Sequence, residues 1–248
     1  MPFDDKVNVP LGSTIAPLRN VMLFTELVQR VVDRPRHLPG MATFHGFSGY
    51  GKTFAATYAA NRFRAYYVEV GESWTKAKFC KSLMVELGLQ PSGTIADMVD
   101  AIIGQLVVTD RPIIIDEFDH VVRRKYHETI REIHDKSGAP MVLIGEELLP
   151  QLLSNSERFH NRMLDWVPAV PADVDDGVEI ARLYVPEISI ARDLVETIVR
   201  KAEGRVRRIA VNFERVRQVA LSEGWSNVDR ASWGERPLFS GQPPARRA

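Results

Sequence analysis

The sequence has little that would place this protein outside the cell or within a membrane. Its 248 residues include one cysteine, Cys80, so no disulfide can form within the chain, and a buried, unreactive thiol is expected. No apolar run approaches the roughly 20 residues that a membrane-spanning helix requires. The acidic start at Asp4 and Asp5 also differs from the basic, then apolar, beginning of a signal peptide. These features predict a cytoplasmic protein that has no membrane partner.

The sequence also lacks an excess of charge of either sign. It has 32 basic and 32 acidic residues, which give a formal net charge of zero. The whole molecule therefore has no overall field that attracts nucleic acid, and any DNA contact must come from local basic patches. The content of 45% hydrophobic and 26% charged residues is typical of a globular protein with one large domain or a domain and a small appendage.

The clearest feature that the sequence does contain is a phosphate-binding loop. It fits the pattern G-x-x-x-x-G-K-[ST] and consists of Gly46, Phe47, Ser48, Gly49, Tyr50, Gly51, Lys52 and Thr53. Glycines in such a loop let successive backbone N–H groups face phosphate oxygens. Lys52 supplies a positive charge for the outer phosphates, and the hydroxyl of Thr53 can hold Mg²⁺. Because a strand-like run precedes the loop and a helical run follows it, we expect nucleotide binding.

A pair of acids, Asp116 and Glu117, marks a second segment with chemical meaning. The pair follows three β-branched residues at 113–115, which indicate a strand buried on both faces of a parallel sheet. Ligands bind at the carboxyl ends of such strands. We expect Asp116 to order the water around Mg²⁺ and Glu117 to polarise the attacking water. The alternative is that both acids only cap the next helix.

Hydrophobic periodicity predicts an α/β core that is followed by helices. Strands are expected at residues 41–44, 65–70, 113–115, 141–145 and 163–170. Core helices are expected at residues 18–32, 54–61, 76–87, 95–106 and 146–153, with one continuous helix after the acidic pair that turns Val122, Tyr126, Ile130 and Ile133 inward. The first helix either lies over the nucleotide base or only packs against the core.

Beyond Pro171 the β signal disappears, and helices are expected at residues 174–184, 190–203 and 207–222. The chain then divides into an N-terminal arm with the nucleotide-binding core (1–171), a helical lid (172–235) and a disordered tail (236–248). His120, His127 and His134 recur every seven residues, which is too far along a helix for one shared metal ion. We expect these histidines to be exposed or at the boundary of the core.

This arrangement of strands, with the loop after the first and the acids after the third, resembles the AAA+ ATPases. The segments 130–135 and 138–145, followed by Arg158 and Arg162, are similar to one branch of that family. The branch contains the target-selecting B proteins of transposing phages, their transposon-borne relatives and a secretion-associated ATPase. The similarity covers about residues 15–220. It implies a five-stranded parallel sheet sandwiched by helices, a small all-helical lid, and ATP with Mg²⁺ as ligands.

The resemblance also assigns roles to arginines outside the loop. Arg158 or Arg162 would be an arginine finger that reaches the nucleotide of the neighbouring subunit and couples hydrolysis to assembly. A surface ion pair is the alternative for each. Arg207 matches the family's sensor-2 arginine, with Arg205 and Arg208 as close alternatives.

The sequence departs from the family pattern at the end of the fourth strand. Many AAA+ enzymes place an asparagine or threonine there as a sensor, whereas this chain has Gly145 and Glu146. Either Glu146 takes that role, or the sensor is absent and turnover is slow.

Two basic patches are candidates for contacts with DNA phosphates. The first is Thr75, Lys76 and Lys78, and the second is Arg123, Arg124 and Lys125. A solvated helix face is the alternative for each patch. A third cluster is assigned to nucleotide sensing or a subunit interface and comprises Arg200, Lys201, Arg205, Arg207 and Arg208. Nothing resembles a base-reading element, so we expect backbone contacts with little sequence preference and strong salt dependence.

The leading hypothesis is an ATPase that assembles with ATP on double-stranded DNA, as a helical filament or a ring. It would present target DNA to a transposase in a bacterial host cell, and its slow hydrolysis of ATP to ADP and phosphate would be stimulated by DNA or a partner. One alternative is an ATP-driven assembly factor that acts on protein partners. The other is a replication-type loader.

Overall fold

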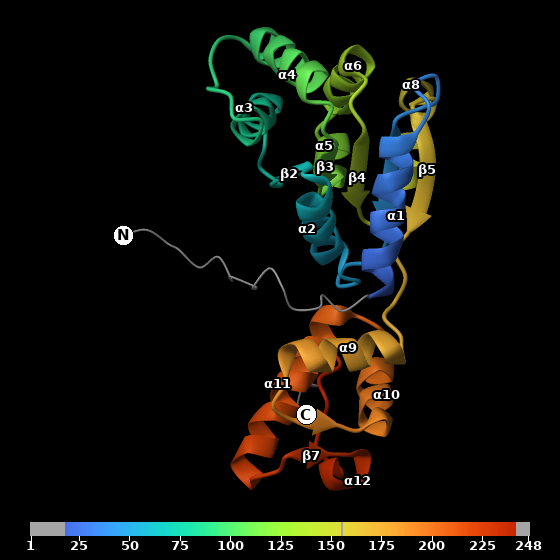
Figure 1. Cartoon of the computed structure of the whole chain (residues 1–248), viewed down its shortest axis with the longest axis vertical. Helices are drawn as coiled ribbons and strands as arrows, with labels where there is room; N and C mark the ends of the chain where they lie inside the picture. The colour runs from blue at the N-terminus through green and yellow to red at the C-terminus, as the bar shows by residue number, and fades with distance from the viewer. Residues whose placement is uncertain (1–17, 155, 242–248) are drawn as a thin grey trace, which may run out of the picture.

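The computed structural model describes residues 18–154 and 156–241, which form a sheet with helices on both faces and a helical region below it (Figure 1). The sheet has five parallel strands in the order β2-β3-β4-β1-β5. The strands are β1 (Met41–His45), β2 (Tyr66–Glu69), β3 (Ile113–Asp116), β4 (Met141–Gly145) and β5 (Met163–Pro168). The α/β prediction with its five-stranded parallel sheet is confirmed.

Helices bury both faces of the sheet, and neighbouring side chains on each strand point to opposite faces. Ile114 joins a cluster with helices α1 (Arg19–Asp33) and α2 (Lys52–Phe63), whereas Ile113 and Ile115 join a cluster on the other face. That second face is covered by α3 (Lys76–Glu86), α4 (Ile95–Thr109), α5 (Phe118–Arg123), α6 (His127–Ser137), α7 (Leu149–Ser154) and α8 (Glu157–His160). The run of three isoleucines thus marks a strand in the middle of a two-sided core.

The helical region follows β5 and lies beside the carboxyl ends of the strands (Figure 1). Its helices are α9 (Val174–Tyr184), α10 (Arg192–Lys201), α11 (Val206–Glu223) and α12 (Arg230–Trp233). The prediction that no strand follows Pro171 is wrong, because β6 (Ser189–Ile190) and β7 (Asn227–Val228) form a short parallel ladder. Strands of two residues are too short to show a hydrophobic period.

The single helix expected after the acidic pair is also wrong, because the chain breaks between α5 and α6. The N–H of Tyr126 bonds to the carbonyl of Val121, and the N–H of Lys125 bonds to the carbonyl of Val122. These bonds form a Schellman motif with Lys125 in the left-handed conformation at φ 57°. A lysine at a position that favours glycine hides the end of the helix from sequence reasoning.

Three further expectations concern His134, Cys80 and the helix expected at 146–153. His134 is buried rather than exposed, and its Nδ1 lies 2.9 Å from the carbonyl oxygen of Ala139. Cys80 is buried as expected, and burial raises the pKa of its thiol to about 11. The helix expected at 146–153 begins only at Leu149.

Residues 236–241, which we expected to be disordered, pack against α11. The backbone N–H of Phe239 donates to Asn212 Oδ1 over 2.7 Å, and Asn212 Nδ2 donates to the Phe239 carbonyl over 2.9 Å. The rest of the expected tail, 242–248, and the N-terminal arm at 1–17 lie outside the described residues. Within the described parts of the chain, no helix combines the length and apolar character needed to cross a membrane.

Candidate functional site

The phosphate-binding loop connects β1 to α2 at the carboxyl edge of the sheet. Gly49 and Gly51 have φ angles of 88° and 83°, which side chains other than glycine rarely adopt. Lys52 begins α2, and its ammonium donates to the carbonyls of Gly46 (2.6 Å) and Phe47 (3.1 Å). Burial lowers the pKa of Lys52, while the nearby acids raise it. The loop therefore holds a positive charge over the first turn of a helix, where an anion is favoured.

Asp116 lies at the end of β3, next to the loop, and is only 2% exposed. Its Oδ2 accepts hydrogen bonds from the hydroxyls of Thr53 (2.8 Å) and Tyr67 (3.0 Å), and its Oδ1 accepts one from the backbone N–H of Glu117 (2.8 Å). Thr53 and Asp116 thus place a hydroxyl and a carboxylate oxygen side by side. Oxygen donors of this kind suit Mg²⁺, so the residues fit the ion that the sequence predicts.

Glu117 follows directly and caps α5 with a left-handed backbone at φ 56°. This conformation turns the chain sharply between the buried strand and the helix. Burial and the negative charge of Asp116 raise the pKa of the Glu117 carboxyl. A carboxylate with a raised pKa is a better proton acceptor than an ordinary glutamate.

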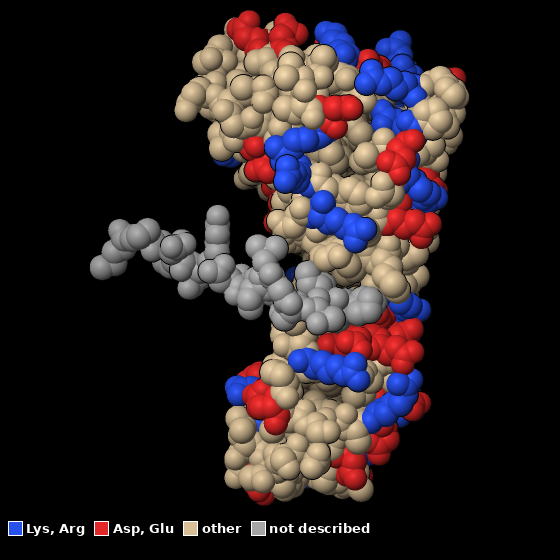
Figure 2. Space-filling model, viewed as in Figure 1, with Lys and Arg blue, Asp and Glu red and all other residues tan. Residues whose placement is uncertain are grey.

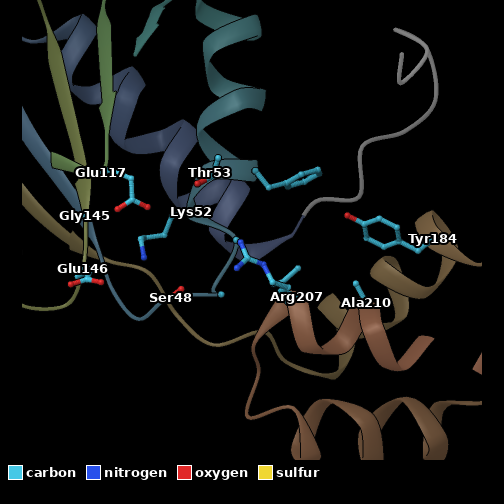
Figure 3. Close-up of a pocket in the computed structure, with 13 residues that line it drawn as sticks. Ser48, Lys52, Thr53, Glu117, Gly145, Glu146, Tyr184, Arg207 and Ala210 are labelled. Atoms are coloured by element: carbon cyan, nitrogen blue, oxygen red, sulfur yellow. The ribbon is translucent and has the colours of Figure 1, made fainter. Parts of the chain in front are cut away.

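Lys52, Thr53 and Glu117 share a cavity of about 360 Å³ between the sheet and the helical region. Figure 3 shows Lys52, Thr53 and Glu117 on one side of it and Tyr184 and Arg207 on the other. The remaining lining residues are Ser48, Gly49, Gly51, Phe54, Gly145, Glu146, Val206 and Ala210. The volume lies within the usual range of small-molecule sites, roughly 300–1,000 Å³.

The three arginines considered for the sensor-2 role have different surroundings. Arg207 lines the cavity, is exposed, and makes no ion pair or side-chain hydrogen bond with any described residue. Arg205 donates to the carbonyl of Ser48 over 2.7 Å, and Arg208 pairs with Glu203 at 2.9 Å. Arg207 is therefore the arginine whose charge is available to a ligand in the cavity.

Glu146 also lines the cavity, and its carboxylate pairs with Arg123 of α5 at 3.1 Å. The backbone N–H of Glu146 donates to the buried Asp119 over 2.8 Å. Sequence reasoning missed both Asp119 and Tyr67. Asp119 follows the acidic pair closely in the sequence, which is the one signal that could have indicated it.

The start of α1 contacts the phosphate-binding loop. Asn20 Nδ2 donates to the carbonyls of Tyr50 and Val170, each over 2.8 Å. Leu18, Asn20, Tyr50 and Val206 line a small cleft beside the main cavity. The first helix thus lies next to the loop as well as packing on the core.

Arg158 and Arg162 lie away from the cavity, at the start of β5. The expectation that the two arginines share one helical face is wrong, because the helix α8 ends before Arg162. Arg162 makes two hydrogen bonds to Asp135, at 2.9 and 3.1 Å. Arg158 is exposed. Of these two arginines, Arg158 is the one whose guanidinium has no partner among the described residues.

The two basic patches expected to contact DNA lie next to each other. Arg124 donates to the carbonyl of Glu72, close to the start of α3, over 2.8 Å. Thr75 caps α3 by accepting the N–H of Lys78, and the Lys78 ammonium lies 5.2 Å from the centre of the Trp74 ring. Basic and acidic side chains are interspersed over the face seen in Figure 2, so positive charge is local.

The third basic cluster is divided in the structure. Arg200 and Lys201 line a separate hollow of about 450 Å³ with Arg230 and Arg236. Arg205, Arg207 and Arg208 instead lie at the start of α11, beside the phosphate-binding loop. The five residues therefore form two groups, and their assignment to nucleotide sensing or a subunit interface stays a prediction.

Part of the sequence and the fold are similar to those of known proteins. Residues 36–153 match a family model described as an AAA domain. The fold is similar to Cdc6p from Pyrobaculum aerophilum, with 16% identity and a TM-score of 0.62 over 87% of this chain and 65% of that one. It is also similar to Aeropyrum pernix ORC1, solved in complex with DNA (15% identity, TM-score 0.59, 86% and 62% covered).

A further similar structure is the Holliday junction branch migration motor RuvB from Thermotoga maritima, with 16% identity and a TM-score of 0.57 over 85% of this chain and 65% of that one. The chain spans slightly less than two thirds of the length of these three proteins. At such identities the similarity concerns the fold. No curated protein matches the chain in sequence.

Proposed function

We propose that this protein hydrolyses ATP to ADP and phosphate, because residues 36–153 match a family model described as an AAA domain. The observation that carries this proposal is the meeting of four side chains at the carboxyl edge of the sheet. Lys52, Thr53 and Glu117 line one cavity, and Asp116 touches Thr53 at 2.8 Å. An ATP phosphate chain in that cavity would replace the two loop carbonyls that now accept from Lys52.

In this proposal each residue has a distinct task. Lys52 and the loop N–H groups bind the outer phosphates, and Thr53 and Asp116 hold Mg²⁺, which neutralises phosphate charge. Glu117 accepts the proton of the attacking water, for which its raised pKa suits it. Arg207 contributes positive charge from the helical region. Closure of that region on the nucleotide would exclude water from the reaction.

The exposed Arg158 supports the proposal that the active form is an assembly. Arg158 lies before the start of β5, whereas the cavity of the same copy lies at the carboxyl ends of the strands. Arg158 would therefore serve the nucleotide of a neighbouring copy. Charge stabilisation of that kind would be complete only between subunits. We propose a helical filament or ring in which bound ATP bridges neighbouring copies.

Double-stranded DNA is the proposed partner of this assembly. The adjoining patches around Lys76 and Arg124 place basic groups on one edge of the core. Similarity in fold to ORC1, which was solved with DNA, and to the branch migration motor RuvB supports this choice. Contacts through phosphates alone predict weak sequence preference and an affinity that falls steeply with salt.

The most specific part of the proposal is that the protein delivers bound DNA to a transposase. It rests on the resemblance of segments 130–135 and 138–145 to the target-selecting branch. It predicts that a purified transposase inserts DNA ends preferentially into DNA that carries the ATP-bound protein. The fold shared with Cdc6p and ORC1 favours a replication-type loader as the second candidate. Insertion that is indifferent to the ATP-bound protein would support the loader.

The catalytic assignment is tested by Glu117→Gln and Lys52→Ala. We expect Glu117→Gln to keep affinity for ATP and to lower turnover by about 100-fold or more, since the proton acceptor is lost. Lys52→Ala should weaken nucleotide binding itself. Turnover and the binding of a fluorescent ATP analogue measure the two effects separately. Normal turnover in Glu117→Gln would refute the assigned base.

The DNA proposal is tested by measuring turnover with and without duplex DNA and by electron microscopy with a non-hydrolysable ATP analogue. We expect stimulated turnover and ordered assemblies on DNA. Lys76→Ala and Arg124→Ala should each reduce DNA retention, whereas Arg182→Ala, which removes a basic residue of α9 outside both patches, should not. Monomers at every protein concentration would contradict the proposal.

A further inference from the structure

Asp119 is a buried acid near the cavity that the reaction described above does not use. It lies on α5 and is 2% exposed. Its Oδ2 accepts the backbone N–H of Glu146 over 2.8 Å, and its Oδ1 has no hydrogen-bond partner among the described residues. Burial raises the pKa of this carboxyl. A carboxylate buried at this cost beside a reaction site is a candidate for a role in the reaction.

Gly145, at the end of β4, lies next to the Asp119 carboxylate. Its backbone does not have a positive φ angle, so the conformation itself does not require glycine. A Cβ at this position would lie 2.2 Å from Asp119 Oδ2 and 2.8 Å from Leu149 Cδ2. The carboxylate of Asp119 therefore occupies the space that a side chain of residue 145 would fill. Glycine at the end of β4 is explained by the neighbouring acid.

The helix α5 holds the loop after β4 at two points. Asp119 holds the backbone of Glu146, and Arg123, one helical turn later, pairs with the Glu146 carboxylate at 3.1 Å. Glu117 is the N-cap of the same helix. One short helix thus carries the proposed base and fixes the wall of the cavity that contains Gly145 and Glu146.

We propose that Asp119 is a positioning residue for ATP hydrolysis, which fixes the Gly145–Glu146 loop relative to Glu117. This inference rests on the proposed ATPase function. In this arrangement the polar group at the end of β4 comes from α5 instead of from the strand itself. Because Lys52 and Thr53 bind the nucleotide without Asp119, its loss affects the rate of the chemical step more than affinity.

The test compares Asp119→Asn with Asp119→Ala. Asparagine keeps an oxygen that accepts the Glu146 N–H, so its kcat should stay within about threefold of the wild-type value. Asp119→Ala removes the acceptor and should lower kcat by about 10- to 100-fold. Affinity for a non-hydrolysable ATP analogue should remain the same in both variants. A loss of folding would instead lower binding and turnover together.

Gly145→Ala provides an independent route to the same contact. Its new methyl group would displace the carboxylate, so kcat should fall as in Asp119→Ala. In the double variant the methyl group no longer meets the carboxylate and has only the end of the Leu149 side chain to shift, so the two losses should not multiply. Ile102→Val, in α4 and buried far from the cavity, is the control for reduced stability and should keep the wild-type kcat.

Each result bears on the inference. Wild-type kcat in Asp119→Ala, a kcat in Asp119→Asn as low as in Asp119→Ala, or multiplied losses in the double variant would overturn it. Absence of turnover in the wild-type protein and Ile102→Val would instead overturn the proposed ATPase function. Thermal unfolding of every variant shows which of them are folded at the assay temperature.

Discussion

At the scale of single residues, the site is held together by contacts between different strands. Tyr67 on β2 donates to Asp116 on β3 over 3.0 Å, so the carboxylate is oriented by a side chain that is distant in sequence. Asp116 also accepts a hydrogen bond from the hydroxyl of Thr53, and these two residues would hold Mg²⁺ together. Groups that orient metal ligands are often as important for metal affinity as the ligands.

We predict that Tyr67→Phe raises the Mg²⁺ concentration needed for half-maximal turnover by about 10-fold, because Asp116 loses the hydroxyl that orients it. The measurement is a Mg²⁺ titration of ATPase activity at saturating ATP. Tyr66→Phe is the matched control, since Tyr66 is the neighbouring residue of β2 and its hydroxyl does not contact Asp116. An unchanged Mg²⁺ dependence in Tyr67→Phe would show that Thr53 and the backbone orient Asp116 sufficiently.

The residues that sequence reasoning found and missed differ in a physical way. Short contiguous motifs contain Lys52, Thr53, Asp116 and Glu117, so their chemistry can be inferred from the sequence alone. Tyr67 reaches Asp116 only because β2 lies beside β3, an order that local sequence does not contain. The role of an arginine depends in the same way on its partners. Asp135 pairs with Arg162, whereas Arg158 has no partner among residues 18–154 and 156–241, a distinction that the sequence could not make.

At the scale of elements, the separation of α5 from α6 determines which side chains surround the cavity. A continuous helix would carry the residues after Arg123 onward in the direction of α5. The Schellman motif at Lys125 instead ends α5 after Arg123 and buries Tyr126 against the core. Long periodic helices such as α9 were predicted with correct bounds, whereas this break was hidden because the left-handed residue is not glycine.

We predict that Lys125→Gly stabilises the protein by about 0.5–1 kcal/mol, because glycine adopts a positive φ angle without the steric cost that lysine has. Chemical denaturation measures the change in the free energy of unfolding. Lys125→Ala removes the same charge and keeps the Cβ, so it should not stabilise the protein. Equal stability of the two variants would mean that the left-handed conformation is not strained.

At the scale of the whole molecule, the predicted α/β fold is confirmed, and residues 36–153 match a model of an AAA domain, while the nucleotide site and the likeness to the target-selecting branch stay predictions. The cavity lies at the carboxyl ends of the strands, and Arg158 lies at the other end of β5. One copy therefore cannot bring its own Arg158 to its own nucleotide. In the proposed assembly, a site completed between copies would link turnover to assembly and would make both depend on protein concentration.

The separation of Glu117 from Arg158 predicts complementation between two inactive variants. Arg158→Ala should lose up to about 1,000-fold in kcat because its neighbours receive no finger, and Glu117→Gln should be inactive for lack of a base. In a mixed assembly, Glu117→Gln subunits supply Arg158 to neighbours that still have Glu117. Mixing the two variants with DNA should therefore restore ATP turnover, with a maximum at intermediate ratios.

Arg162→Ala is the matched control for this experiment. It breaks the pair with Asp135, which should cost about 1 kcal/mol of stability because both side chains are partly exposed, yet it should hydrolyse ATP without a partner variant. If Arg158→Ala is active alone and Arg162→Ala requires mixing, Arg162 is the finger and its pair with Asp135 opens on assembly. If mixing restores nothing while both variants enter the same filament, Arg158 does not act across the interface, and its assignment as the finger is wrong.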